Sequence, residues 1–418
     1  MVRVLFLHPD LGIGGAERLV VDAAIALKER GHHISFLTNH HDTNHCFKET
    51  ADGNLSVQVV GDWLPRSLFG RFYALCAYFR MLYAAIYATW CIIRKEHVDV
   101  VFCDQISIAI PVLRLARPRP KIIFYCHFPD QLLSKKEGYL KRLYRWPINI
   151  IEEFTINMAD KVLVNSKFTL RVFQETFRRI NINPEVLYPS LNTKYFDEME
   201  KNSAVFSFDL PSDSYVYLDI NRFERKKNHS LALKSFHKLS STLSGSDLEL
   251  WKRCRLIITG GYDERVNENV EHFIELSDLI SELELTENVI LLRSSSDDEK
   301  FQLLRRAQCL LYTPIHEHFG IVPLEGMYMS KPVLALNSGG PTETIVHDST
   351  GFLCEPNVDS FAKAMKVVFQ NKALCERMGA MGRKRVQQKF SFEAFSNKLG
   401  DIVQAVMDCN GYNTKKLK

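Results

Sequence analysis

The sequence predicts an α/β fold of two doubly wound domains, each built on a parallel sheet. Apolar runs of four to seven residues alternate with amphipathic stretches of helical length through both halves, and this alternation is typical of β-α-β units. The 418 residues suffice for two or three domains, because a domain usually has about 150. We therefore expect one Rossmann-like domain over residues 1–190, a second over 191–390, and a C-terminal helical extension over 391–418.

Six runs in the first half have the length of strands, at 2–7, 34–37, 57–60, 98–103, 122–126 and 162–164. Five more follow in the second half, at 216–220, 256–259, 289–292, 310–312 and 333–336. Proline and polar residues interrupt both patterns at 184–196, which we interpret as the hinge. Residues 360–408 read as helices, and the last of them is expected to cross back onto the first domain.

The composition excludes several classes of protein. With 46% hydrophobic and 24% charged residues, the chain is not disordered, collagenous or a coiled coil. A net charge of only +4 argues against a nucleic-acid binder, which needs many clustered cations. Residues 1–190 hold 24 Lys and Arg against 18 Asp and Glu, and the remainder holds 29 against 31. The basic excess therefore belongs to the first half.

The cysteines and the termini suggest a cytosol-facing protein. The ten cysteines form no C-x-x-C pair, so we expect reduced thiols and neither a zinc site nor a disulfide framework. The N-terminus enters an apolar strand without a basic leader, which argues against a signal peptide. The C-terminal Lys415-Lys416-Leu417-Lys418 resembles a dilysine retrieval signal of the endoplasmic reticulum.

Four strand-to-helix loops contain unusual residues, and ligands of such sheets bind beyond the carboxyl ends of the strands. The first loop contains Gly14 and Gly15 directly before a helix. Glycines let the backbone approach a phosphate at a helix N-terminus, although a tight turn without ligand gives the same pattern. Glu17 stands where a dinucleotide fingerprint needs its third glycine, which disfavours an NAD enzyme.

The second and third loops contain a histidine and a cluster of cations. His127 ends a strand, where it can donate a hydrogen bond or a proton, or serve only a structural role. Residues 221–228 contain Arg222 and Lys227 among four cations. Such a cluster is either a solvated charged run or a clamp for a diphosphate.

The fourth loop, 313–326, carries Glu317 and Glu325 around the start of a helix with Pro323 in its first turn. One carboxylate can meet sugar hydroxyls and the other a ribose diol, while amides near Gly320 and Ile321 hold a phosphate. A plain capped helix is the alternative interpretation.

These loops, in this order, resemble those of the retaining glycosyltransferases of family four, which have the GT-B fold of two facing Rossmann-like domains with a cleft between them. Glu317 and Glu325 match the E-x7-E pattern of that family, and Arg222 with Lys227 match its phosphate-binding pair. Runs such as FYCHFPD, NRFERKKN and EHFGIVPLE are similar to the branch that adds an α-1,3 and then an α-1,6 mannose to a dolichol-linked oligosaccharide.

The resemblance implies GDP-mannose as donor and dolichol-diphosphate-linked Man1-2GlcNAc2 as acceptor, at the cytoplasmic face of the endoplasmic reticulum membrane. Other enzymes of lipid-linked oligosaccharide assembly are implied as partners, and nucleic acid is not. Glu317 would contact the mannose, Arg222 and Lys227 the diphosphate, and His127 the region beside the attacked carbon. The remaining implied donor-binding residues are Gly14, Gly15, Arg293, His318, Phe319, Gly320, Ile321 and Glu325.

The resemblance also bears on mechanism and cofactors. No Asp-x-Asp motif stands at a strand end, so we expect no essential metal, with cations of the chain neutralising the diphosphate. No carboxylate is nominated as a nucleophile, and we therefore favour front-face substitution over double displacement. The alternatives are another GT-B transferase with a different nucleotide sugar or lipid acceptor, and a catalytically silent GT-B scaffold.

Residues 66–94 contain no acid and many aromatics, and 81–93 is uncharged. These 13 residues fall short of the roughly 20 that a spanning helix needs. The segment can therefore span, re-enter or lie in a membrane, or form an ordinary core helix. Five arginines of this segment and of the basic stretch 101–150 are candidates for lipid headgroups or the acceptor diphosphate: Arg71, Arg80, Arg114, Arg117 and Arg119.

Overall fold

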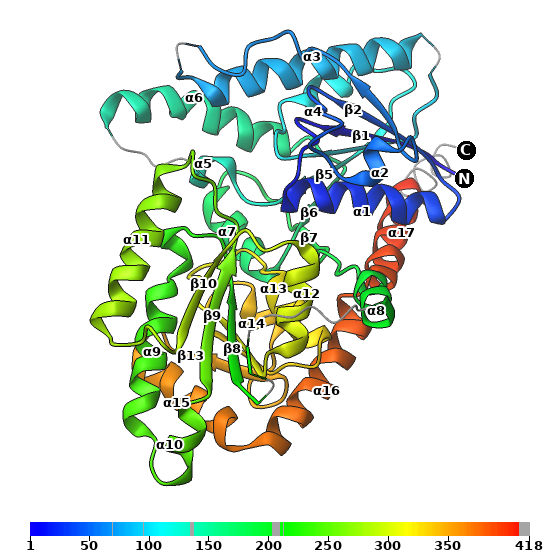
Figure 1. Cartoon of the computed structure of the whole chain (residues 1–418). Coiled ribbons are helices and arrows are strands. Elements are labelled where there is room, and N and C mark those ends of the chain that lie inside the picture. The colour runs from blue at the N-terminus through cyan, green and yellow to red at the C-terminus, as the bar shows by residue number, and fades with distance from the viewer. Residues whose placement is uncertain (69, 95, 134–137, 203–209, 212, 409–418) are drawn as a thin grey trace. The chain divides into compact units, whose positions relative to one another are not determined.

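The computed structural model describes residues 1–68, 70–94, 96–133, 138–202, 210–211 and 213–408. The chain divides into two compact units (Figure 1). Unit 1 comprises Met1–Ser190 and Phe392–Lys418, and unit 2 comprises Leu191–Ser391. The dilysine motif lies outside the described residues.

In the described residues, unit 1 has a parallel sheet of seven strands in the order β3-β2-β1-β4-β5-β6-β7. The strands are β1 Arg3–His8, β2 His33–Thr38, β3 Ser56–Val59, β4 Val100–Asp104, β5 Lys121–Cys126, β6 Lys161–Val164 and β7 Glu185–Val186. β4 and most of β5 are buried along their length. Their nearly continuous apolar runs are what a parallel sheet covered on both faces requires.

Helices cover both faces of the unit 1 sheet: α1 Gly15–Glu29, α2 Lys48–Ala51, α3 Tyr73–Ile93, α4 Ala109–Leu113, α5 Asp130–Leu133, α6 Tyr139–Ile156, α7 Lys167–Thr176 and α17 Phe392–Asp408. Alternate side chains of one strand enter different cores. Phe102 packs with α1 and α17, whereas Val101 and Cys103 pack with α3 and α4. The C-terminal helix is thus part of unit 1.

Unit 2 has a parallel sheet whose described strands run in the order β10-β9-β8-β11-β12-β13. These strands are β8 Tyr215–Ile220, β9 Cys254–Gly260, β10 Val289–Arg293, β11 Cys309–Tyr312, β12 Val333–Leu336 and β13 Gly351–Cys354. Its helices are α8 Thr193–Asn202, α9 His229–Thr242, α10 Ser246–Trp251, α11 Asn267–Glu282, α12 Asp297–Arg306, α13 Val322–Tyr328, α14 Pro341–Thr344, α15 Val358–Gln370 and α16 Lys372–Lys389, with a 3₁₀ turn at Arg225–Lys227.

Two strands were not predicted. β7 lies inside the segment 184–196 that we interpreted as hinge, and Glu185 pairs with Leu163 of β6. β13 pairs with β12 although it begins at Gly351. β7 has only two residues, too few for a periodic pattern, and β13 begins with glycine, which is depleted in strands. In both cases the partner strand rather than local propensity decides the conformation.

The strand order reverses direction between β1 and β4 in unit 1, and between β8 and β11 in unit 2. Ligands of open α/β sheets bind beyond the carboxyl ends of the strands at such switch points. The loop after β1 contains Gly14 and Gly15, the loop after β8 contains Arg222 and Lys227, and the loop after β11 contains Glu317. Each unit therefore places predicted site residues at its own switch point.

Candidate active site

In unit 2, an ion pair joins the two loops that flank the switch point. Nζ of Lys227 lies 2.6 Å from Oε2 of Glu317, and both side chains are largely buried. The Thr313 hydroxyl donates to the carbonyl of Lys227 at 2.8 Å, which ties the loops a second time. Burial alone would raise the pKa of Glu317, but the charge of Lys227 outweighs it and holds the pKa below its usual range. The carboxylate is therefore ionised and positioned.

The loop that carries Arg222 and Lys227 is held from beneath by His229, the first residue of α9. Its Nδ1 lies 2.9 Å from Oδ2 of Asp219 and its Nε2 lies 3.0 Å from the carbonyl oxygen of Arg222. Both partners are acceptors, so the ring must donate from both nitrogens, which only the imidazolium does. Burial alone would lower the pKa of His229, but the charge and hydrogen bond of Asp219 raise it.

Glu325 lies in the first turn of α13 and is only 7% exposed. Its Oε1 accepts a hydrogen bond from Nζ of Lys300 at 2.6 Å. Its Oε2 is buried and has no hydrogen-bond partner among the described residues. A buried carboxylate oxygen without a partner is costly, so this atom is suited to accept hydrogen bonds from a ligand.

The residues that follow Glu317 in this loop differ in how their side chains are placed. Phe319 is buried and its ring packs 6.0 Å from that of Phe390, so only its backbone can contribute to a site. The charge of His318 helps to lower the pKa of Glu317 after the larger effects of burial and Lys227. The Gly340 amide donates to the Glu317 carbonyl at 2.8 Å, and a Cβ at Gly340 would collide with the Phe319 backbone. Residues 339–343 (GGPTE) thus support the loop that carries Glu317.

Arg222 and Arg293 are exposed cations at this edge. The Arg222 guanidinium lies 3.9 Å from a Glu224 oxygen, and the side chain is 66% exposed. Arg293 ends β10, the outer strand, with its guanidinium 5.2 Å from the ring centre of Tyr262. Arg293 is thus separated from the Lys227–Glu317 pair by the width of β9 and β8.

In unit 1, His127 belongs to a buried cluster that the sequence did not reveal. Asp104, which ends β4 and is 1% exposed, accepts from Nδ1 of His8 through Oδ1 and from Nε2 of His127 through Oδ2, both at 2.8 Å. Nε2 of His8 lies 3.0 Å from the carbonyl oxygen of Asp10. His8 thus donates twice and is an imidazolium. Burial alone would lower the pKa of His8, but Asp104 raises it to about 10.

The cluster fixes the tautomer of His127. With Nε2 donating to Asp104 and the His8 charge neutralising that carboxylate, Nδ1 of His127 can act as an acceptor. Burial alone would raise the pKa of Asp104, but the charge of His8 and the hydrogen bonds of both rings keep it low. An acid directly after a fully apolar strand, as in VVFCD, was the available sequence signal for Asp104.

Gly14 and Gly15 open α1, as predicted, and Glu17 lies over this helix start. A Cβ at Gly14 would meet the Glu17 carboxylate, whereas the position of a Cβ at Gly15 is open. Oε1 of Glu17 lies 3.8 Å from Nε2 of His8. The helix N-terminus and the histidine cluster are therefore neighbours.

The structure changes the interpretation of the basic residues. Arg80 is 7% exposed and donates to the Asn39 carbonyl and to Asp62, so it faces the protein. Arg114 donates to the Met158 carbonyl and pairs with Asp160. β5 is preceded by Arg114, Arg117 and Arg119 and followed by His127. The three arginines therefore lie at the opposite end of the strand from His127. Arg71 is exposed at the start of α3.

α3 is long and apolar enough to cross a membrane by length and composition. One face of α3, including Met81, Ala84 and Ala88, belongs to the core beneath the sheet. The other face exposes Phe79, Trp90 and further apolar residues. In this structure α3 therefore combines a core face with an exposed aromatic face.

Comparison with known proteins identifies the family. Residues 13–195 match the family described as Glycosyltransferase Family 4, and residues 200–385 match Glycosyl transferases group 1. The human alpha-1,3/1,6-mannosyltransferase ALG2 is 52% identical over 401 residues, covering 95% of this chain and 94% of the human protein. The chain belongs to the alpha-1,3/1,6-mannosyltransferase family. The Saccharomyces cerevisiae member is 39% identical, with 97% and 85% of the two chains covered.

Solved structures show the fold of this mannosyltransferase family member. A sucrose-phosphate synthase from Thermosynechococcus elongatus superimposes with a TM-score of 0.73 at 19% identity, covering 98% of this chain and all of that one. A glycosyltransferase from Rickettsia africae gives 0.72 at 20% identity, with 97% and 99% covered. The predicted GT-B class is thus confirmed, and the family models and curated relatives confirm the predicted glycosyltransferase activity.

Proposed function

We propose that this mannosyltransferase transfers mannose from GDP-mannose, with retention, to dolichol-diphosphate-linked Man1-2GlcNAc2, first in α-1,3 and then in α-1,6 linkage. The unpartnered buried oxygen of Glu325 beside the loop of the Lys227–Glu317 pair carries the donor part of the proposal. A ribose diol supplies the two hydroxyl donors that such a carboxylate accepts. The relatives named above support the two linkages, because their names specify alpha-1,3 and alpha-1,6 mannose transfer.

Arg222 and Lys227 are proposed to hold the donor diphosphate. Negative charge grows on the diphosphate as the sugar leaves, and cations already fixed near it stabilise the transition state without reorganisation. Lys227 is fixed by Glu317, and the backbone of Arg222 is fixed by His229. The ionised Glu317 is an acceptor for mannose hydroxyls.

We further propose front-face substitution as the mechanism. The bond from the anomeric carbon to the leaving phosphate breaks while the acceptor hydroxyl attacks on the same face, and the departing phosphate takes the proton of that hydroxyl. His127, with its tautomer fixed by Asp104, is proposed to orient the donor sugar through a hydrogen bond. No divalent metal is assigned a role.

Unit 1 is proposed to face the cytoplasmic surface of the endoplasmic reticulum membrane. The exposed aromatic face of α3 supports this, together with exposed Leu143, Trp146 and Phe154 on α6. An exposed apolar helix face next to basic residues suits a bilayer surface. Flotation with anionic liposomes tests the idea, and a chain that stays at the bottom of the gradient would refute it.

The decisive experiment supplies the purified chain with GDP-mannose and a lipid-diphosphate-linked ManGlcNAc2, then measures the mass of the released glycan. We expect addition of two hexoses that α-mannosidase removes. UDP-glucose in place of GDP-mannose is the matched control. Transfer from the UDP-sugar alone would overturn the donor assignment, and addition of a single mannose would overturn the assignment of both linkages to one chain.

A further inference from the structure

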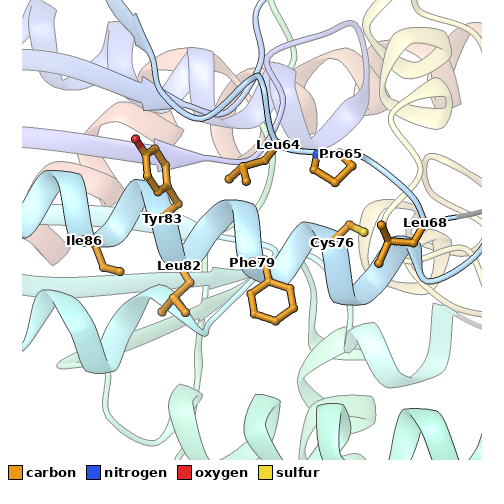
Figure 2. Close-up of a pocket in the computed structure, with 8 residues that line it drawn as sticks. All are labelled: Leu64, Pro65, Leu68, Cys76, Phe79, Leu82, Tyr83 and Ile86. Atoms are coloured by element: carbon orange, nitrogen blue, oxygen red, sulfur yellow. The ribbon is translucent and has the colours of Figure 1, made fainter.

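An apolar groove lies between α3 and the segment 64–68 of unit 1. Figure 2 shows the groove, whose volume is about 330 Å³. Its lining residues are Leu64, Pro65, Leu68, Cys76, Phe79, Leu82, Tyr83 and Ile86. This volume is within the range of small-ligand sites, about 300 to 1,000 Å³.

The segment 60–68 is built to stand against α3. Gly61 has a φ of +80°, and a Cβ there would lie 2.8 Å from the Tyr83 ring. Leu68 and Arg71 exchange two backbone hydrogen bonds of 2.9 and 2.8 Å, which close the end of the segment onto the start of α3. The Trp63 ring packs edge-on against Tyr83 at 5.8 Å. The groove is therefore a formed feature of this segment.

One wall of the groove is connected to the histidine cluster. Arg66, next to the lining residue Pro65, pairs with the Asp10 carboxylate at 3.4 Å. The carbonyl oxygen of the same Asp10 accepts from His8. The groove thus adjoins the carboxyl edge of the sheet, where His127 lies.

The lining and its rim specify the chemistry of an occupant. The lining side chains carry hardly any hydrogen-bonding groups, so a peptide backbone would leave its amides unsatisfied there. Arg66 follows the lining residue Pro65 and pairs with Asp10, and the exposed Arg71 is joined to the lining residue Leu68 by two backbone hydrogen bonds. A molecule with a diphosphate followed by a hydrocarbon chain matches this order of charge and apolar surface.

We propose that the groove binds the first isoprene units of the polyisoprenoid chain that carries the acceptor glycan, with the adjoining diphosphate near Arg66. The proposal rests on the proposed function, because it assigns the groove to the acceptor of that reaction. In this proposal the protein binds the lipid directly, and the lipid is not only a membrane anchor.

A matched pair of substitutions on α3 tests the proposal. Ile86 lines the groove and is 53% exposed, whereas Ile93 is 54% exposed and does not line it. The two residues are seven positions apart, so they lie on one side of the helix. Because both are half exposed, Ile86→Ser and Ile93→Ser are expected to leave the fold intact.

The acceptor KM of each full-length variant is measured with ManGlcNAc2-diphosphate carrying a long polyisoprenoid, a single isoprene unit, or a straight alkyl chain. We expect Ile86→Ser to raise the KM for the polyisoprenoid acceptor about fivefold through lost apolar contact. The KM for the single-isoprene acceptor should rise less, because only one unit is left to enter the groove. Ile93→Ser should change neither. If both variants raised the KM for the polyisoprenoid acceptor equally, the surface would be one that contacts the bilayer, and the proposal would be overturned. If Ile86→Ser raised the KM for the straight-chain acceptor as much as that for the polyisoprenoid acceptor, the proposal would also be overturned.

A binding measurement separates this proposal from the proposed function. Addition of a 20-carbon isoprenyl diphosphate should change the emission of Trp63 in the wild type and in Ile93→Ser, and much less in Ile86→Ser. Loss of this emission change in Trp63→Phe would show that the change comes from Trp63. The same change on addition of inorganic diphosphate would overturn the groove assignment. Lack of mannose transfer with intact isoprenyl binding would overturn the proposed function alone.

Discussion

Substitution of Asp104 by Asn should remove a pH-dependent part of the stability. Asp104 is the buried carboxylate that pairs with the His8 imidazolium. The pKa of His8 rises from 6.5 to about 10 in the folded chain. A rise of this size, at about 1.4 kcal/mol per pH unit, corresponds to roughly 5 kcal/mol of stability, the upper end of the cost of breaking a buried ion pair.

The sign follows from the raised pKa. Below pH 6.5, His8 is protonated in both the folded and the unfolded chain, and the stabilisation is fully present. Between pH 6.5 and about 10 only the folded chain holds the proton, so the stabilisation falls as the pH rises. At pH 9 about 3 kcal/mol of it is already lost. The stability difference between wild type and Asp104→Asn should therefore shrink by that amount from pH 6 to pH 9.

Denaturant unfolding of the full chain at pH 6 and pH 9, followed by tryptophan fluorescence, measures this difference. Asp348→Asn is the control, because Asp348 is 71% exposed and its carboxylate lies 3.5 Å from the exposed His347. Its effect should remain below about 1 kcal/mol at both pH values. If the free energies of unfolding of the wild type and Asp104→Asn differ by the same amount at pH 6 and pH 9, His8 is not charged in the folded chain.

Three further outcomes are expected in the transfer assay. Lys227→Ala should lower kcat about 10²- to 10³-fold. The control Lys226→Ala, which removes a cation paired with Glu224, should retain near-normal kcat. Equal rates in the two variants would contradict a role of Lys227 in binding the diphosphate. Glu325→Gln should raise the KM for GDP-mannose about tenfold by weakening a charged hydrogen bond, and a change confined to kcat would argue against ribose binding. Chelation with EDTA should leave turnover unchanged, and a loss that added Mn²⁺ restores would show a metal requirement.

The sequence predicted most of the fold because long apolar strands and amphipathic helices have strong local patterns. The eleven predicted runs correspond to strands of the two sheets, with ends that differ by a few residues. β7 and β13 were not predicted because β7 has two residues and β13 begins with glycine, so that both depend on their partner strands. The acid-free, aromatic composition of 66–94 suggested a membrane segment, but periodicity alone does not distinguish a membrane helix from one that covers a sheet. Burial of Arg80 shows which face of α3 is inside.

The sequence showed candidate site residues where charges stand in loops, and not where they stand in the core. Glu317 and Lys227 were visible as loop residues before helices, and the structure joins them at 2.6 Å. Arg114 was a candidate for lipid headgroups or the acceptor diphosphate, yet it binds the Met158 carbonyl and Asp160 at the other end of β5. Charge patterns along the chain do not say at which edge of a sheet a loop lies.

The two units hold their site loops in the same physical way. In unit 1 the His8 imidazolium lies between the Asp104 carboxylate and the Asp10 carbonyl, and in unit 2 the His229 imidazolium lies between the Asp219 carboxylate and the Arg222 carbonyl. A neutral ring would lose one of the two bonds, because it donates from one nitrogen only. A strand carboxylate that keeps the ring charged therefore also keeps the loop in place.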